Sequence, residues 1–120
     1  MNADEIAVWN RAALHSGGPS PREGDLALSS LLRVHGLVMN GGVLHAVEVA
    51  TEAELRASCA GFRYLGLPEV ADLLEAARNE RWTGESEARL DGAYGELVDD
   101  KTIGVRFCTH MTRDRELYAP

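Results

Sequence analysis

The sequence predicts an all-α fold, arranged as a single compact domain of about six to seven helices. Apolar residues recur every three or four positions along most of the chain, which is typical of helices that bury one face. Capping residues and helix-stopping glycines separate these periodic segments. The 120 residues are 45% apolar and 26% charged, a composition that suits one globular domain and excludes a disordered chain.

The first helix is expected over residues 4–14, with two acidic residues in its first turn, where carboxylates complement the helix dipole. The side chains predicted to face the core are Ile6, Trp9 and Ala13. A loop rich in Gly, Pro and Ser follows at residues 16–21. We therefore divide the chain into an N-terminal helix with its loop, residues 1–24, and a helical body, residues 25–120, which together form one compact unit.

The second helix is expected over residues 26–39, with Asp25 as its N-cap, because an aspartate side chain accepts the free amide protons of a helix N-terminus. Its broad apolar stripe indicates a central helix. The stripe consists of Leu28, Leu31, Leu32, His35 and Val38, widened by Leu26, Val34, Leu37 and Met39. Asn40-Gly41-Gly42 should stop this helix, since Asn and Gly adopt the left-handed conformation of helix C-termini. A short helix over residues 43–50 follows.

Thr51 and Glu54 have the spacing of a capping box, in which each side chain bonds the backbone amide of the other residue, and they open a fourth helix. Its predicted core residues are Leu55, Cys59, Phe62 and Leu65. Gly66 should end this helix and Pro68 begin the next, which is expected to reach Glu80. The core residues of that fifth helix are predicted to be Val70, Leu73, Leu74 and Ala77.

A turn at Trp82-Thr83-Gly84 precedes a sixth helix over residues 85–98. Its apolar face carries Leu90, Ala93, Tyr94 and Leu97. Residues 102–109 match two patterns, because Ile103, Val105 and Phe107 alternate as in a strand, while Ile103, Phe107 and Met111 fit a helix. Two preceding aspartates suited to capping, and the helices upstream, favour a helix.

The composition excludes several classes of protein. With 12 basic and 19 acidic residues the net charge is −7, which disfavours direct nucleic-acid binding. No apolar run approaches the roughly 18 residues of a membrane span, and the N-terminus does not resemble a signal peptide. Cys59 and Cys108 lack the spacing of a zinc site and are expected to be buried, reduced thiols, although a disulfide between them stays open. We therefore expect a cytoplasmic protein that does not contact membranes.

The acidic excess lies in the middle of the chain. Residues 51–100 carry 12 acidic and five basic residues, whereas residues 101–120 carry two acidic and four basic ones. Carboxylates three or four positions apart on a helix are roughly 4.5–6 Å apart along its axis, which resembles the spacing of successive phosphates. The candidate partner-binding carboxylates are Glu69, Asp72, Glu75, Glu80, Glu85, Glu87 and Asp91. Interleaved arginines such as Arg78, Arg81 and Arg89 favour the competing interpretation, a surface that only confers solubility.

Several motifs occur together in a recognisable order. They are Asn40-Gly41-Gly42 after an apolar helix, Phe62-x-x-Leu65-Gly66 before Pro68, Leu90-Asp91-x-x-Tyr94, and a C-terminal segment with Arg106, Phe107, Leu117 and Tyr118. In these features the chain resembles, over residues 26–120, the bacterial DNA-mimic-protein-like family of small helical domains. Such domains usually carry aromatic residues after Gly-Gly, where this chain has Val43, Leu44 and His45.

The resemblance implies a non-enzymatic interaction or regulatory module. Such a protein would present carboxylates in a DNA-like pattern to a basic partner, for example a DNA-binding regulator, and a homodimer stays open. The residues themselves show no catalytic motif and no pair of histidines at metal-binding spacing, so we expect no enzyme activity, cofactor or metal. The alternative is a small-molecule or metal-binding helical domain centred on Asn40 and His45, in the groove beside Gly41 and Gly42. His35 is predicted to be a core histidine.

Overall fold

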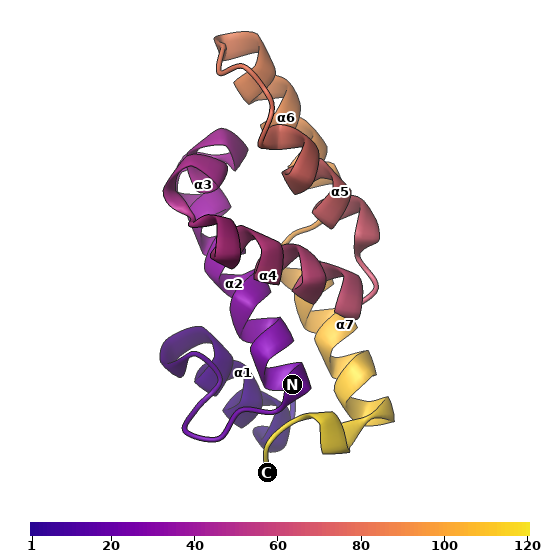
Figure 1. The fold of residues 1–120 in the computed structure, drawn as a ribbon. Helices are drawn as coiled ribbons and strands as arrows, with labels where there is room; N and C mark the ends of the chain where they lie inside the picture. The colour runs from indigo at the N-terminus through magenta and orange to yellow at the C-terminus, as the bar shows by residue number, and fades with distance from the viewer.

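The computed structural model describes all 120 residues and confirms a single all-α domain, including a helix over residues 102–109. The helices are α1 (Ala3–His15), α2 (Glu23–Gly41), α3 (Val43–Val49), α4 (Glu52–Tyr64), α5 (Pro68–Ala77), α6 (Gly84–Leu97), α7 (Asp100–Arg113) and a short 3₁₀ helix, η1 (Arg115–Leu117). The molecule is elongated, measuring 44 × 25 × 20 Å. In Figure 1 the turn between α5 and α6 lies at one end, and α1 lies with both termini at the other.

Helix α2 is the central helix, because α1, α3, α4 and η1 all pack against it. Leu28, Leu31 and Val34 on α2 are completely buried. Helix α4 crosses α2 at Gly61, where a Cβ atom would lie 2.4 Å from the carbonyl oxygen of Ala27. Only glycine therefore permits the two backbones to approach this closely.

The predicted capping box of α4 and the predicted junction between α4 and α5 are both confirmed. Thr51 and Glu54 form the expected capping box of α4, with hydrogen bonds of 2.9 and 3.1 Å. Gly66 has a φ of +77°, and Pro68 is the first residue of α5. The predicted core residues of α4 are buried, as are Val70, Leu74, Leu90, Tyr94, Ile103, Phe107 and Tyr118. None of the helices combines the length and apolar character needed to cross a bilayer.

The prediction that Asp25 is an N-cap is wrong. Helix α2 begins at Glu23, so Asp25 lies within its first turn and is completely buried. Oδ2 of Asp25 accepts hydrogen bonds from the backbone amides of Arg22, at 3.0 Å, and of Ala119, at 2.7 Å. The carboxylate therefore joins the start of α2 to the C-terminal segment of the chain.

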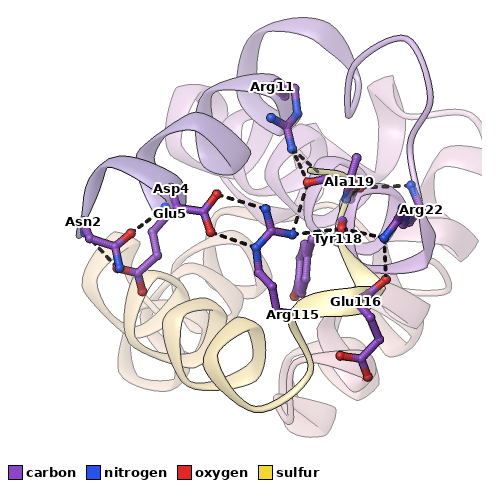
Figure 2. Close-up of polar contacts among 10 residues, drawn as sticks. Asn2, Asp4, Glu5, Arg11, Arg22, Arg115, Glu116, Tyr118 and Ala119 are labelled. Carbon is purple, nitrogen blue, oxygen red and sulfur yellow. Dashed lines mark hydrogen bonds and ion pairs between the residues drawn. The ribbon is translucent and has the colours of Figure 1, made fainter.

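Three arginines complete this C-terminal latch, which we define as residues 115–119 with their contacts (Figure 2). Arg11 donates to the carbonyl oxygen of Ala119 at 2.9 Å, and Arg22 to that of Tyr118 at 3.3 Å. Arg115 donates to both carbonyl oxygens and also pairs with both carboxylate oxygens of Asp4. Helix α1 is thereby fastened to the C-terminal segment, although the two are more than 100 positions apart in sequence.

The predicted buried face of α1 is also wrong in part. Val8 and Ala12 are the buried residues of α1, whereas Ile6 is 47% exposed and Ala13 is exposed. Trp9 is half-buried, with its ring 5.7 Å from that of Phe107. The C-terminal latch contacts α1 through Asp4 and Arg11, and the face of α1 that packs against α2 is the one carrying Val8 and Ala12.

Three smaller predictions need correction. Leu26 and Met39 do not widen the buried stripe of α2, because both are at least half exposed. Helix α5 ends at Ala77, before the predicted Glu80, since the following backbone hydrogen bonds span three residues and not four. Cys59 is buried and Cys108 is only partly so, and both are free thiols.

We predict that Asp25→Ala lowers the free energy of unfolding by about 3 kcal/mol, because two partly buried amides, and Arg11 at 3.8 Å from Oδ1, lose their anionic partner. Urea denaturation of the variant and the wild type measures this difference. Glu23→Ala is the matched control, since Glu23 is an exposed acid of the same helical turn whose side chain makes no bond. The control should cost less than about 1 kcal/mol. Equal losses for the two variants would contradict the role of the latch.

Candidate functional site

The motif Asn40-Gly41-Gly42 forms a joint between α2, α3 and α6. Gly42 has a φ of +93° and connects the end of α2 to the start of α3. The backbone amide of Val43 donates to Oδ1 of Asp91 on α6 at 2.8 Å. A Cβ atom on Gly42 would lie 2.8 Å from Oδ2 of Asp91. Asp91 thus caps α3 from another helix, and glycine is needed for its approach.

One turn further along α6, Tyr94 ties the same helices to α7. Its hydroxyl lies 2.8 Å from Nδ1 of His35, and Nε2 of His35 lies 2.6 Å from Oδ1 of Asp100. Tyr94 and His35 are both buried, which confirms His35 as a core histidine. Burial, with a smaller contribution from the charge of Asp100, raises the pKa of Tyr94 well above its usual range. Tyr94 therefore stays neutral, and the motif residues Asp91 and Tyr94 have structural roles.

Asn40 and His45 do not converge on one site. A cavity of about 350 Å³ lies beside Asn40, Gly41 and Gly42, with Asp91 and Tyr94 among its other lining residues. The ring of His45 is not part of that lining; it packs over Gly41, where a Cβ atom would lie 2.4 Å from Cδ2 of the imidazole. The structure contains no group of three or more His, Cys, Asp or Glu side chains that could hold a metal ion. The alternative prediction of a metal site centred on Asn40 and His45 therefore has no set of ligands in the structure.

Helices α5 and α6 bring the candidate carboxylates together in what we call the acidic hairpin, residues 68–97 (Figure 1). This segment carries eight acidic and three basic side chains. The turn of the hairpin forms the end of the molecule that lies farthest from the chain termini. The hairpin thus has a strong negative excess and projects at its turn, while α5 packs against α4.

Four of the seven candidate carboxylates bond other side chains. Asp72 and Glu75 share Arg63 of α4, at 2.7 and 2.9 Å, and they raise the pKa of that guanidinium. Glu80 pairs with Arg89, and Glu87 accepts a hydrogen bond from the indole nitrogen of Trp82 at 3.0 Å. These pairs are solvent-exposed, and such pairs contribute only about 0–1 kcal/mol each to stability. Another cation can therefore compete for these carboxylates at little cost.

Glu69 and Glu85 are exposed and make no hydrogen bond or ion pair through their side chains. Glu96 shares these properties, although it was not among the seven predicted site residues. Trp82 is 48% exposed in the turn of the hairpin. An exposed indole among carboxylates is a surface that a cationic protein can contact through both charge and apolar area. The position of Trp82 in a predicted turn was the available sequence signal for this exposure.

We predict that Gly42→Ala lowers the free energy of unfolding by about 2 kcal/mol, because alanine disfavours positive φ and its Cβ atom would displace Asp91. Gly92→Ala is the control, since Gly92 lies within α6 with open space around it. That substitution should raise stability by roughly 0.5–1 kcal/mol through helix propensity. Thermal and urea unfolding measure both values. A neutral effect of Gly42→Ala would show that the joint tolerates other geometries.

The sequence was also compared with models of known protein families, and one family matches the part of the chain that contains the joint and the acidic hairpin. The family model for DMP19-like protein matches residues 21–112, a range that includes the joint and the whole acidic hairpin. No curated protein and no solved structure matches the chain significantly. Because the matched range covers most of the chain, the protein belongs to the DMP19-like family, a family of DNA mimic proteins.

Proposed function

We propose that this protein binds a basic, DNA-binding partner protein in the place of DNA, with the acidic hairpin as the contact surface. The observation that carries the proposal is the charge of the hairpin, eight carboxylates against three guanidinium groups, in a segment whose turn forms one end of the molecule. Membership of a DNA mimic family supports the same type of function. Binding alone suffices for it, and no catalytic step is required.

The carboxylates on α5 are spaced to suit a partner protein whose basic surface ordinarily contacts the phosphates of DNA. Glu69, Asp72 and Glu75 follow one another at three-residue intervals on α5. Successive members are therefore about 4.5 Å apart along the helix axis. Lysine and arginine side chains of a partner can pair with the free Glu69 and can replace Arg63 at Asp72 and Glu75. Such exchange is inexpensive because these pairs are exposed to solvent.

The negative excess also predicts how binding depends on salt. Opposite charges accelerate the encounter of two proteins, and salt weakens this effect as the Debye length falls from about 10 Å at 0.1 M to about 3 Å at 1 M. If the partner binds DNA in the cytoplasm, this protein must also be in the cytoplasm to bind it. The protein would then control how much of the partner is free to bind DNA.

Affinity capture with duplex DNA as competitor tests this function. The immobilised full chain is exposed to lysate of the source organism at low salt, with and without excess duplex DNA, and bound proteins are identified by mass spectrometry. We expect a basic DNA-binding protein whose capture is prevented both by duplex DNA and by about 0.5 M salt. Capture of only proteins that DNA does not displace would contradict the proposal.

We predict that the variant Glu69→Lys with Glu85→Lys lowers the affinity for the captured partner at least tenfold. Each reversal removes a free carboxylate and adds a like charge, and about 1.4 kcal/mol in total gives this factor. Glu23→Lys with Glu116→Lys is the control with the same change in net charge. Like the first pair, Glu23 and Glu116 are exposed first-turn acids whose side chains are unbonded, but they lie outside the hairpin. Titration of each variant with the purified partner measures the affinity, and equal losses for both would locate binding elsewhere.

A further inference from the structure

A small cavity with basic walls lies outside the acidic hairpin, between the end of α4 and one face of α7. Its volume is about 190 Å³. Its polar lining residues are Arg63, Tyr64, Arg106, Thr109, His110 and Arg113. No carboxylate lines the cavity, although the chain as a whole is acidic.

The geometry of two helices creates this cavity. Arg106, Thr109, His110 and Arg113 share one face of α7, since they follow the spacing of three and four residues. Helix α4 ends at Tyr64, and the chain turns at Gly66 with a φ of +77°. Nη1 of Arg106 lies 3.4 Å from the position that a Cβ atom of Gly66 would occupy, so the guanidinium lies over the turn.

The guanidinium groups retain unused donors. The side chain of Arg106 makes no hydrogen bond and no ion pair within the protein, so all its N–H groups are available. Arg113 donates to Asp114 only through Nε, at 2.9 Å, and both of its Nη atoms remain free. Arg63 uses its Nη atoms for Asp72 and Glu75 and retains Nε.

His110 adds a donor whose tautomer is set by the fold. The residue is 9% exposed, and its Nδ1 lies 3.1 Å from the hydroxyl of Tyr118, which is completely buried. Because this hydroxyl has no other acceptor, it donates to Nδ1, and the neutral imidazole then carries its hydrogen on Nε2. Nε2 has no partner in the protein. The hydroxyl of Tyr64, another lining residue, is buried and has no hydrogen-bond partner in the protein, and such a buried donor requires an acceptor.

We propose that this cavity binds a compact oxyanion, namely inorganic phosphate or the phosphoryl group of a phosphate monoester. The walls offer donors from guanidinium, imidazole and hydroxyl groups, and such a ligand offers several acceptor oxygens. The planar fork of an arginine matches two phosphate oxygens at once. The volume of about 190 Å³ is well above what a single water molecule needs and is enough for one such group. The ligand class differs from the proposed DNA-binding partner, although Arg63 lines this cavity and also pairs with Asp72 and Glu75 of the acidic hairpin.

The pKa of His110 reports whether the cavity holds an anion. Burial, and then the charge of Arg113, lower the pKa of His110, while Asp114 and Glu23 oppose this change. Tyr64 of α4 and Tyr118 also face the ring, and both are neutral hydroxyls at physiological pH. An anion placed next to Nε2 stabilises the imidazolium ion. The pKa of His110 should therefore rise when the site is filled.

The test titrates the full-length protein with sodium phosphate, and separately with phenyl phosphate, at ionic strength held constant with sodium chloride. NMR spectra follow the histidine ring and arginine side-chain signals, and calorimetry measures affinity. We expect saturable shifts at His110 and Arg106 and a higher pKa of His110. Arg106→Gln should weaken binding about tenfold, since it removes one charge-assisted contact.

Arg81→Gln is the matched control, because Arg81 is likewise exposed and its side chain unpaired, but it lies in the turn of the acidic hairpin. It should leave phosphate binding unchanged. Tighter binding of phenyl phosphate would identify a monoester as the ligand class, and equal binding would identify the free anion; both support the site. Non-saturating shifts, or equal losses in the two arginine variants, would overturn the proposal.

Discussion

The structure depends on how the two ends of α2 are held, because α1, α3, α4 and η1 all pack against this helix. At its start, the buried carboxylate of Asp25 accepts the amides of Arg22 and Ala119. Just beyond its end, Asp91 of α6 accepts the amide of Val43. Both carboxylates bond backbone groups of distant segments. Removal of either leaves a polar group without its partner, which costs more than the loss of an exposed ion pair.

The same joint supports the surface that we assign to partner binding. Asp91 and Tyr94 attach α6 to α2 and α3, and His35 continues this attachment to Asp100 of α7. The remaining carboxylates of the acidic hairpin either make solvent-exposed pairs or are unpaired, and in our proposal they serve as charges at defined spacing. Helix α6 therefore carries both the structural residues of the motif Leu90-Asp91-x-x-Tyr94 and exposed acids such as Glu85. Rigid attachment matters, because a preformed array of charges binds with less loss of conformational entropy.

Sequence patterns predicted those features whose partners lie within a few residues. The Thr51–Glu54 capping box and the Gly66–Pro68 junction are local, so their residue types alone identify them. The contact between Asp91 and Val43 spans 48 positions, and the bond from Ala119 to Asp25 spans 94, so no local pattern could indicate them. The seven candidate acids were found by charge, but composition could not separate Asp91, which caps α3, from the unpaired Glu69 and Glu85.

Hydrogen–deuterium exchange of the full chain, with and without its captured partner, tests the central claim most directly. Amides protected by a bound protein exchange more slowly, and the protected peptides locate the contact surface. The account predicts protection concentrated in residues 68–97, and its disappearance when duplex DNA displaces the partner. Protection confined to α1, α2 or the C-terminal latch, with the acidic hairpin unchanged, would contradict the assignment of the acidic hairpin as the DNA-like surface.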